Sequence, residues 1–344
     1  MSRYRRASLG SDFGYTPGEQ PPEDGDWLKL NTNEAPLPPS PAVARAIGEA
    51  AAGLRRYPNP YGEPLRGALA AHHRVAAEQV FVGNGADQVI DCCFRAFCEP
   101  GSTVVYPEPT YSLFPVLAAM FGAAVTELPV DPALSLPAAL GTAPGQLRFA
   151  VNPNSPTGVW MPPDALAELL SGAPGVVAVD EAYCDFAPAS SIPLLGSHDN
   201  WLVLRTFSKS HALAGLRVGY AVGAAPLIAD LYAVKDSYPI DRCAIAGALA
   251  ALDDEGHHRA IVDIIVAERA RVTAALTAAG WDVPESRANF VYARPPDGDA
   301  TAMQQRLRQA RILVRHFAES HTDRLRITIG APAENDRLLA CVRG

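Results

Sequence analysis

The sequence predicts an α/β fold in which a mostly parallel sheet is covered by helices, with a smaller α+β domain beside it. Between residues 80 and 223, short apolar runs alternate with stretches of helical spacing. Runs that are apolar at every position are typical of strands buried on both faces of a parallel sheet. After about residue 225 the alternation gives way to long helices and a few short strands, which indicates a second body.

An N-terminal arm is expected over residues 1–40, which are rich in proline, glycine and polar residues. Residues 41–54 have helical spacing and end in a glycine-containing segment, and a helix resumes over residues 64–75 after the turn-rich string RRYPNPYGEP. We expect the arm to pack with the smaller domain.

The central region makes up a predicted large domain over residues 41–240. Strands are expected at residues 80–83, 102–107, 147–152, 176–183, 201–207 and 215–223. Helices are expected between them at residues 86–98, 109–122 and 164–172.

The C-terminal region, residues 241–344, is predicted to form the smaller α+β domain. Helical spacing covers residues 225–237 and 242–279, and the part from 256 to 279 is the expected connection between the two bodies. Short strands follow in NFVYARP and LRITIG, with one helix between them and one after.

Composition narrows the classes of function. The formal net charge is −8 and the single basic cluster is Arg3, Arg5 and Arg6, so nucleic-acid binding is not expected. No apolar run is long enough to span a bilayer and no secretory signal is visible, which predicts a soluble, cytoplasmic protein. The six cysteines lack metal-ligand spacing, so we expect free thiols and no metal site.

The string RTFSKSHALAGLRVGY, residues 205–220, places a lysine just beyond a strand. Ligands of open α/β sheets bind beyond the carboxyl ends of strands, and lysine is the residue that forms imines with carbonyl cofactors. Arg217 could grip a phosphate and lower the proton affinity of Lys209, and Thr206 and Ser208 could donate hydroxyl hydrogen bonds to the same phosphate. In a short Ser-Lys dipeptide alone, a surface lysine would be the better interpretation.

The string VVAVDEAYCDF, residues 176–186, ends a buried strand on an aspartate. A buried carboxylate needs a partner, and a protonated pyridine nitrogen would serve. Tyr183, three residues after Asp180, could reach a phenolic oxygen of the same ring. A metal ligand or a strand cap are the alternatives, although no phosphate-loop motif precedes this strand.

Two further strings suit cofactor binding. VNPNSPTGVW, residues 151–160, offers asparagines for a ring oxygen, or is an ordinary Asn-Pro turn. VGNGADQVID, residues 82–91, runs from a strand through a glycine turn into a helix, whose first N–H groups bind phosphate well. A plain helix cap by Asn84 or Asp87 is the alternative.

Together these strings resemble the fold-type I pyridoxal-phosphate enzymes, in the class I/II aminotransferase branch. The resemblance rests on NPNSPTG, VDEAY and TFSKSHALAGLRVGY in this order, and it covers nearly the whole chain. Other strings are most similar to the histidinol-phosphate aminotransferase family: PGEQ, KLNTNEAPLPPSP, RRYPNPYG, GNGADQ, YPEPTYSLF, VKDSYPIDR, NFVYAR, ILVRHF and LRITIGAPAEN.

The resemblance implies pyridoxal 5′-phosphate (PLP) as cofactor and gives roles to individual residues. Lys209 would carry PLP as a Schiff base and shuttle a proton, Asp180 would pair with the pyridinium nitrogen, and Tyr183 would contact the ring oxygen. Tyr111 would stack on the ring, and Asn154 would contact its oxygen. The groups implied to hold the phosphate are Ala86, Asp87, Thr206, Ser208 and Arg217.

The resemblance also implies how partners and substrates bind. Tyr57 would reach the phosphate of a partner subunit, so a homodimer with shared active sites is expected. Arg326 would bind the anionic group of an amino donor and then of a 2-oxo acid, assisted by Arg315. Tyr15 and Asn33, on the arm, would close over the substrate.

Two positions depart from the family pattern. Many relatives have asparagine immediately before the PTG triplet, where this chain has Ser155, so the ring-oxygen contact falls to Asn154 or Asn152, and we choose Asn154. The usual glycine before ILVR is replaced by Arg311, which puts the aim of Arg315 in question.

The expected reaction is a ping-pong transamination, between L-histidinol phosphate and 2-oxoglutarate, in histidine biosynthesis. The same residues would also suit an aromatic-amino-acid aminotransferase or a threonine-phosphate decarboxylase. A cofactor-sensing domain of a transcriptional regulator is disfavoured, since the first forty residues are too few and too proline-rich for a helix-turn-helix. A catalytically inactive relative is disfavoured by the joint presence of Lys209, Asp180 and Arg217.

Overall fold

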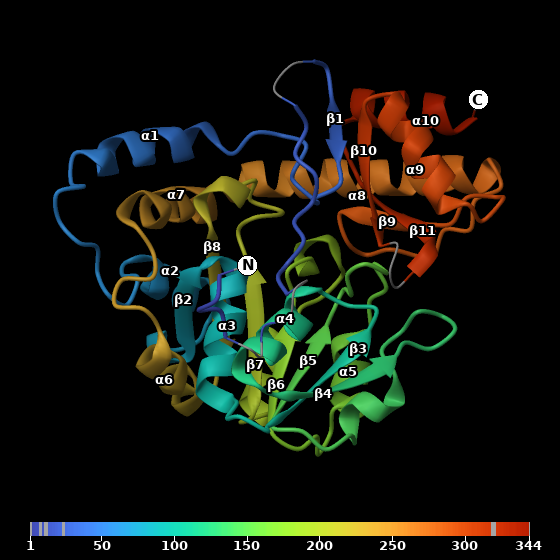
Figure 1. The fold of residues 1–344 in the computed structure, drawn as a ribbon. Coiled ribbons are helices and arrows are strands. Elements are labelled where there is room, and N and C mark those ends of the chain that lie inside the picture. The colour runs from blue at the N-terminus through green and yellow to red at the C-terminus, as the bar shows by residue number, and fades with distance from the viewer. Residues whose placement is uncertain (1, 7–8, 10–12, 23–24, 318–320, 344) are drawn as a thin grey trace.

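The computed structural model describes residues 2–6, 9, 13–22, 25–317 and 321–343. Seven strands form the larger sheet, shown below the centre of Figure 1. Their spatial order is β2 (Val80–Asn84), β8 (Val218–Gly223), β7 (Trp201–Thr206), β6 (Val176–Asp180), β5 (Leu147–Val151), β3 (Thr103–Glu108) and β4 (Ala124–Pro129). β8 runs antiparallel to both of its neighbours, and the other pairings are parallel.

Helices cover both faces of this sheet because its strands are apolar on both sides. β5, β7 and β8 are buried at every position. One face packs against α3 (Gly85–Phe97), α4 (Leu113–Phe121) and α6 (Ala225–Val234). The other face packs against α1 (Pro41–Ala51), α2 (Leu65–His73), α5 (Pro163–Leu169) and α7 (Arg242–Asp253). The predicted mostly parallel sheet covered by helices is confirmed.

A second, smaller sheet has the order β1 (Leu28–Leu30), β10 (Ile312–Phe317), β11 (His321–Thr328) and β9 (Phe290–Ala293). Its apolar core is shared with α8 (Glu255–Ala278), α9 (Ala300–Gln309) and α10 (Pro332–Arg343), the orange and red helices of Figure 1. β1 comes from the N-terminal arm and pairs in parallel with β10. The arm is thereby tied to the smaller body.

Several elements differ from the sequence prediction. The strands β1, β4 and β10 are not among the predicted ones. The continuous helix expected over residues 242–279 is two helices, because Asp254 interrupts it and its carboxylate accepts a hydrogen bond from the His257 N–H at 3.1 Å, which caps α8. The predicted strand 176–183 ends at Asp180, which places Tyr183 in the loop beyond it.

In the part of the chain that the structure describes, no helix combines the length and the apolar character needed to cross a lipid bilayer.

Candidate active site

A cavity of about 150 Å³ lies beyond the carboxyl ends of β5, β6 and β7, where Val151, Asp180 and Thr206 reach its wall. The N-terminus of α3, the arm and the smaller sheet complete the wall. Thirteen of the predicted site residues line it: Tyr15, Asn33, Ala86, Asp87, Tyr111, Asp180, Tyr183, Thr206, Ser208, Lys209, Arg217, Arg315 and Arg326. The topology therefore brings segments from the whole length of the chain to one place.

Lys209 follows β7 and extends its amine into this cavity. Its Nζ donates a hydrogen bond to the carbonyl oxygen of Thr32 on the arm at 3.1 Å. The same nitrogen lies 5.8 Å from the centre of the Tyr183 ring. The amine is thus held between the arm and the loop after β6. The contact with Thr32 is not predicted from the sequence.

Asp180 ends β6 with its side chain in the cavity wall and 4% of the residue exposed. Burial raises the pKa of this carboxyl to about 6, although the N–H of Ala182 donates to it at 3.0 Å. A buried carboxylate is stabilised by a cationic hydrogen-bond donor in contact with it. The protonated nitrogen of a pyridine ring is such a donor, so this position fits PLP.

Two tyrosines stand at the sides of the cavity. Tyr183 is buried and its hydroxyl oxygen accepts a hydrogen bond from Asn33 Nδ2 at 2.9 Å. The Tyr111 hydroxyl donates to Asp87 Oδ1 at 2.8 Å, and its ring meets that of Tyr15 edge-on at 6.1 Å. Contacts with Asn33 therefore fix the Tyr183 ring, and contacts with Asp87 and Tyr15 fix the Tyr111 ring.

The start of α3 forms an anion cradle. The helix begins at Gly85, and Asn84 makes no side-chain capping hydrogen bond, so the N–H groups of the first turn are not capped by that side chain. Gly85 has a φ of 76°, and a Cβ there would meet Arg217 at 2.6 Å. A Cβ on Gly219 would meet the nitrogen of Ala86 at 2.3 Å. Only glycine lets the chain approach so closely here.

Side chains add to this cradle. Arg217 Nη2 donates to Asp87 Oδ2 at 2.6 Å. Thr206 Oγ1 donates to Ser208 Oγ at 3.0 Å and accepts from the Ser208 N–H at 3.1 Å. A guanidinium, two hydroxyls and the helix start converge in one corner, a donor set that suits a phosphate group.

Two arginines line the cavity from paired strands of the smaller sheet. Arg315 on β10 and Arg326 on β11 are cross-strand partners. Arg326 donates to Ser155 Oγ at 3.0 Å and to the Asn31 carbonyl at 3.1 Å, while its buried Nε has no hydrogen-bond partner among the residues that the structure describes. Arg315 donates to the carbonyl oxygens of Thr16 and Pro17 at 3.0 and 3.1 Å. Two cations and one unused donor fit an anionic substrate group.

Asn154 and Tyr57 do not line the cavity. Asn154 is buried and its amide donates to the Pro109 carbonyl at 2.9 Å, so it stabilises the turn, while Ser155 reaches the cavity instead. Tyr57 is 78% exposed and stacks on Tyr238 with ring centres 4.5 Å apart. Arg311 adopts a φ of 59°, the left-handed conformation that glycine favours.

Comparison with known proteins shows which family the chain belongs to. The model of aminotransferase class I and II matches residues 25–342. Histidinol-phosphate aminotransferase 1 of Bradyrhizobium diazoefficiens is 46% identical over 100% of this chain and 99% of its own length. Histidinol-phosphate aminotransferase 2 of Thiobacillus denitrificans is 44% identical over 99% of this chain and 98% of its own.

The fold is also similar to that of a solved member of this family. Histidinol-phosphate aminotransferase from Sinorhizobium meliloti in complex with pyridoxal-5′-phosphate has a TM-score of 0.86 at 27% identity, covering 92% of this chain and 89% of that one. The fold-type I architecture expected from the resemblance is confirmed. The chain therefore belongs to the class I and II aminotransferases.

Proposed function

We propose that this protein is a PLP-dependent histidinol-phosphate aminotransferase of histidine biosynthesis. It would move the amino group of L-histidinol phosphate to 2-oxoglutarate, giving imidazole acetol phosphate and glutamate. The observation that carries the proposal is the convergence of Lys209, Asp180 and Arg217 on one cavity that Arg315 and Arg326 also line. The names of full-length relatives at 46% and 44% identity support the choice of substrate.

The residues divide the work by position. When bound, PLP supplies an electron-withdrawing ring that stabilises negative charge on the substrate carbon that loses its proton. Asp180 keeps the ring nitrogen protonated, and the cradle of Arg217, Thr206 and Ser208 binds the phosphate. Lys209 Nζ, the amine in the cavity, takes the proton from the substrate and returns it.

Arg326 and Arg315 bind the two substrates in turn. Histidinol phosphate carries a phosphate and 2-oxoglutarate carries carboxylates, and a planar guanidinium can donate paired hydrogen bonds to the oxygens of either group. The contacts of both arginines with backbone carbonyls of the arm tie substrate binding to that segment. Tyr15 and Asn33 of the arm complete the enclosure and exclude water.

We propose that the protein assembles as a homodimer. This assembly would cover the exposed Tyr57–Tyr238 stack and bring Tyr57 to the phosphate of the partner's site.

We assign residues 1–40 to the arm, 41–240 to the large PLP-binding domain and 241–344 to the small domain. A cytoplasmic location agrees with six free cysteines, since a reducing compartment preserves thiols.

The test is a comparison of kcat/KM on three amino compounds with PLP-saturated protein: L-histidinol phosphate, L-phenylalanine and L-threonine phosphate, with 2-oxoglutarate as acceptor. We expect histidinol phosphate to react fastest, with glutamate formed in equal amount. A preference for phenylalanine would make the protein an aromatic aminotransferase. Release of carbon dioxide from threonine phosphate would make it a decarboxylase. Either result would refute the proposed substrate.

A further inference from the structure

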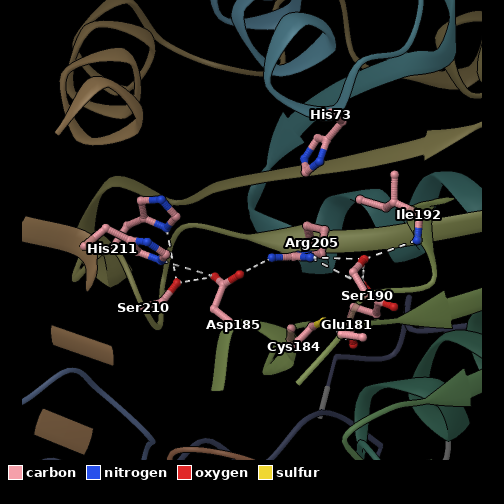
Figure 2. Close-up of polar contacts among 12 residues, drawn as sticks. His73, Glu181, Cys184, Asp185, Ser190, Ile192, Arg205, Ser210 and His211 are labelled. Atoms are coloured by element: carbon pink, nitrogen blue, oxygen red, sulfur yellow. Dashed lines mark hydrogen bonds and ion pairs between the residues drawn. The ribbon is translucent and has the colours of Figure 1, made fainter. Parts of the chain in front are cut away.

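A polar network, buried at Glu181, Arg205 and Ser210 and partly buried at Asp185 and Ser190, lies beside the cavity without lining it. It consists of Glu181, Asp185, Ser190, Arg205 and Ser210, and we call it the Arg205 network. Figure 2 shows the guanidinium of Arg205 between the two carboxylates, with Ser190 at one end and Ser210 at the other. None of the five members is among the residues that line the cavity. The network is therefore not part of the cofactor site already described.

Every carboxylate oxygen of the network accepts at least one hydrogen bond. Arg205 donates through Nη1 to Glu181 Oε2 at 3.3 Å and through Nη2 to Asp185 Oδ1. Glu181 also accepts from Ser190 Oγ and from the Ser191 N–H, both at 2.6 Å. Asp185 Oδ2 accepts from Ser210 Oγ. Each carboxylate thus joins Arg205 to a different loop.

Burial makes these contacts consequential. Glu181 and Ser210 are each 1% exposed, and Arg205 is 8% exposed. Although burial by itself raises the pKa of Asp185, the Arg205 guanidinium holds it well below its ordinary value. Asp185 is therefore ionised at neutral pH. Moving one partner away would leave a buried charge unpaired, which costs free energy. The folded state therefore strongly favours the paired arrangement of the network.

The network is joined to the cavity through neighbouring residues in the sequence. Three pairs of consecutive residues each have one member in the cavity wall and the other in the network. The pairs are Asp180 with Glu181, Thr206 with Arg205, and Lys209 with Ser210. Along β7 this follows from the alternation of side chains across a strand. The positions of the three cavity residues are therefore coupled through one set of charged contacts.

Two histidines close the Ser210 end. His211, next to Ser210, stacks on His258 of α8 with ring centres 4.1 Å apart and planes 20° apart. Their nitrogens lie within 4.8 Å of Asp185, which resembles a metal-ligand set. The lone pairs of imidazole lie in the ring plane, however, so two nearly parallel rings do not converge on one ion. The stack instead packs the Lys209 loop against α8.

We propose that Asp185 is a positioning residue for Lys209. It holds Ser210 with one carboxylate oxygen and Arg205 with the other, and so fixes the lysine amine relative to Asp180 and to the phosphate cradle. This inference rests on the proposed function, because the position of the amine matters only if it reacts with a bound cofactor.

The experiment compares wild-type holoenzyme with Ser210→Ala and Asp185→Asn. Ser210→Ala removes the hydroxyl that contacts Asp185 and the neighbouring His211 but leaves the contact between Asp185 and Arg205, and it remains informative if Asp185→Asn fails to fold. We expect kcat to fall roughly 10- to 100-fold, as for a reacting group displaced by about 1 Å, with KM changed less than about threefold. The pH midpoint of the visible absorbance of bound PLP should also move, because the surroundings of the amine set its proton affinity.

Glu268→Gln is the matched control. Glu268 is a similarly buried carboxylate on α8 that accepts from Arg271 and Asn335, with no contact to the Lys209 loop. We expect it to lower stability and leave both kcat and the spectral midpoint unchanged. Wild-type values in Ser210→Ala and Asp185→Asn would overturn the inference, and so would an equal shift in Glu268→Gln. A wild type that binds no PLP would instead contradict the proposed function.

Discussion

Arg326 donates a hydrogen bond to Ser155 Oγ across 3.0 Å, and this contact joins the two bodies of the molecule at the cavity. Arg326 belongs to β11 of the smaller sheet, while Ser155 lies in the turn after β5 of the larger one. Burial lowers the pKa of Arg326, and among the described residues its hydrogen bonds go to a hydroxyl and a backbone carbonyl, not to a carboxylate. An incoming anion would supply that contact.

Replacing Arg326 should therefore affect substrates and spare the cofactor. We expect Arg326→Gln to lower kcat/KM for both histidinol phosphate and 2-oxoglutarate by roughly 10- to 100-fold, the loss of about 1.5–3 kcal/mol for a charged hydrogen bond. The dissociation constant of PLP should stay the same. Arg324→Gln is the control, because Arg324 lies on the same strand and pairs with Asp282 away from the cavity. A loss confined to PLP affinity would argue against this role.

The phosphate cradle makes a separate prediction. Arg217→Gln should weaken the binding of PLP by roughly 10- to 100-fold, again from one charged hydrogen bond. Pyridoxal, which lacks the phosphate, should bind the variant and the wild type equally. Fluorescence titration with the two compounds measures both constants. Equal losses for PLP and pyridoxal would mean that Arg217 acts on the ring or on the fold, not on the phosphate.

Asp180 should destabilise the PLP-free protein. Burial raises its pKa from 3.8 to about 6. Between these values the folded state binds more protons than the unfolded state, so stability falls as the pH rises through this window. Above pH about 6, Asp180→Asn should therefore be more stable than wild type by up to about 3 kcal/mol, from a shift of about two pKa units.

Urea unfolding of the PLP-free proteins between pH 4 and 8 measures this difference, which should disappear towards pH about 4. The same variant should bind PLP less tightly than wild type, because the amide cannot pair with a protonated ring nitrogen. A stability difference that is independent of pH would show that Asp180 is not the group responsible.

The strands that could be predicted from the sequence are those buried on both faces. β5 and β7 are apolar and buried along their length, and such runs admit few other structures. β4 lies at the edge of the sheet and exposes Ala124, Val125 and Glu127, so its composition resembles that of a loop. β1 has three residues and pairs with a strand far along the chain, which no local pattern specifies.

The predicted site residues that line the cavity lie in short motifs at strand ends or in the arm, and the sheet topology brings the strand ends together. The ring-oxygen contact predicted for Asn154 stays a prediction, although Asn154 is not among the residues that line the cavity. Its amide is directed into the turn by Pro109 and Thr157, and only coordinates reveal that Ser155 faces the cavity instead. The contact between Lys209 and Thr32 uses a backbone carbonyl, which every residue has, so no residue type could signal it.

Arg311 offers a test of backbone strain. At a φ of 59° a residue with a Cβ is strained by about 1–2 kcal/mol, and glycine relieves this strain. Glycine also loses more backbone entropy on folding, which costs about 0.5–1 kcal/mol and reduces the net gain. We expect Arg311→Gly to raise the free energy of unfolding by about 0.5–1 kcal/mol. Arg308→Gly, inside α9, should instead lower it by about 1 kcal/mol. Equal destabilisation by both would show that the Arg311 side chain contributes more than its backbone costs.

The most direct test of the account is to locate the cofactor on the chain. The sequence contains three lysines, Lys29, Lys209 and Lys235, and borohydride reduction of the PLP-loaded protein fixes the cofactor to the amine that binds it. Lys29 pairs with Glu34, and Lys235 donates to backbone carbonyls outside the cavity. Peptide mapping by mass spectrometry should find the added mass on Lys209 alone, and Lys209→Ala should take up none. Labelling of Lys29 or Lys235 in place of Lys209 would contradict the central claim.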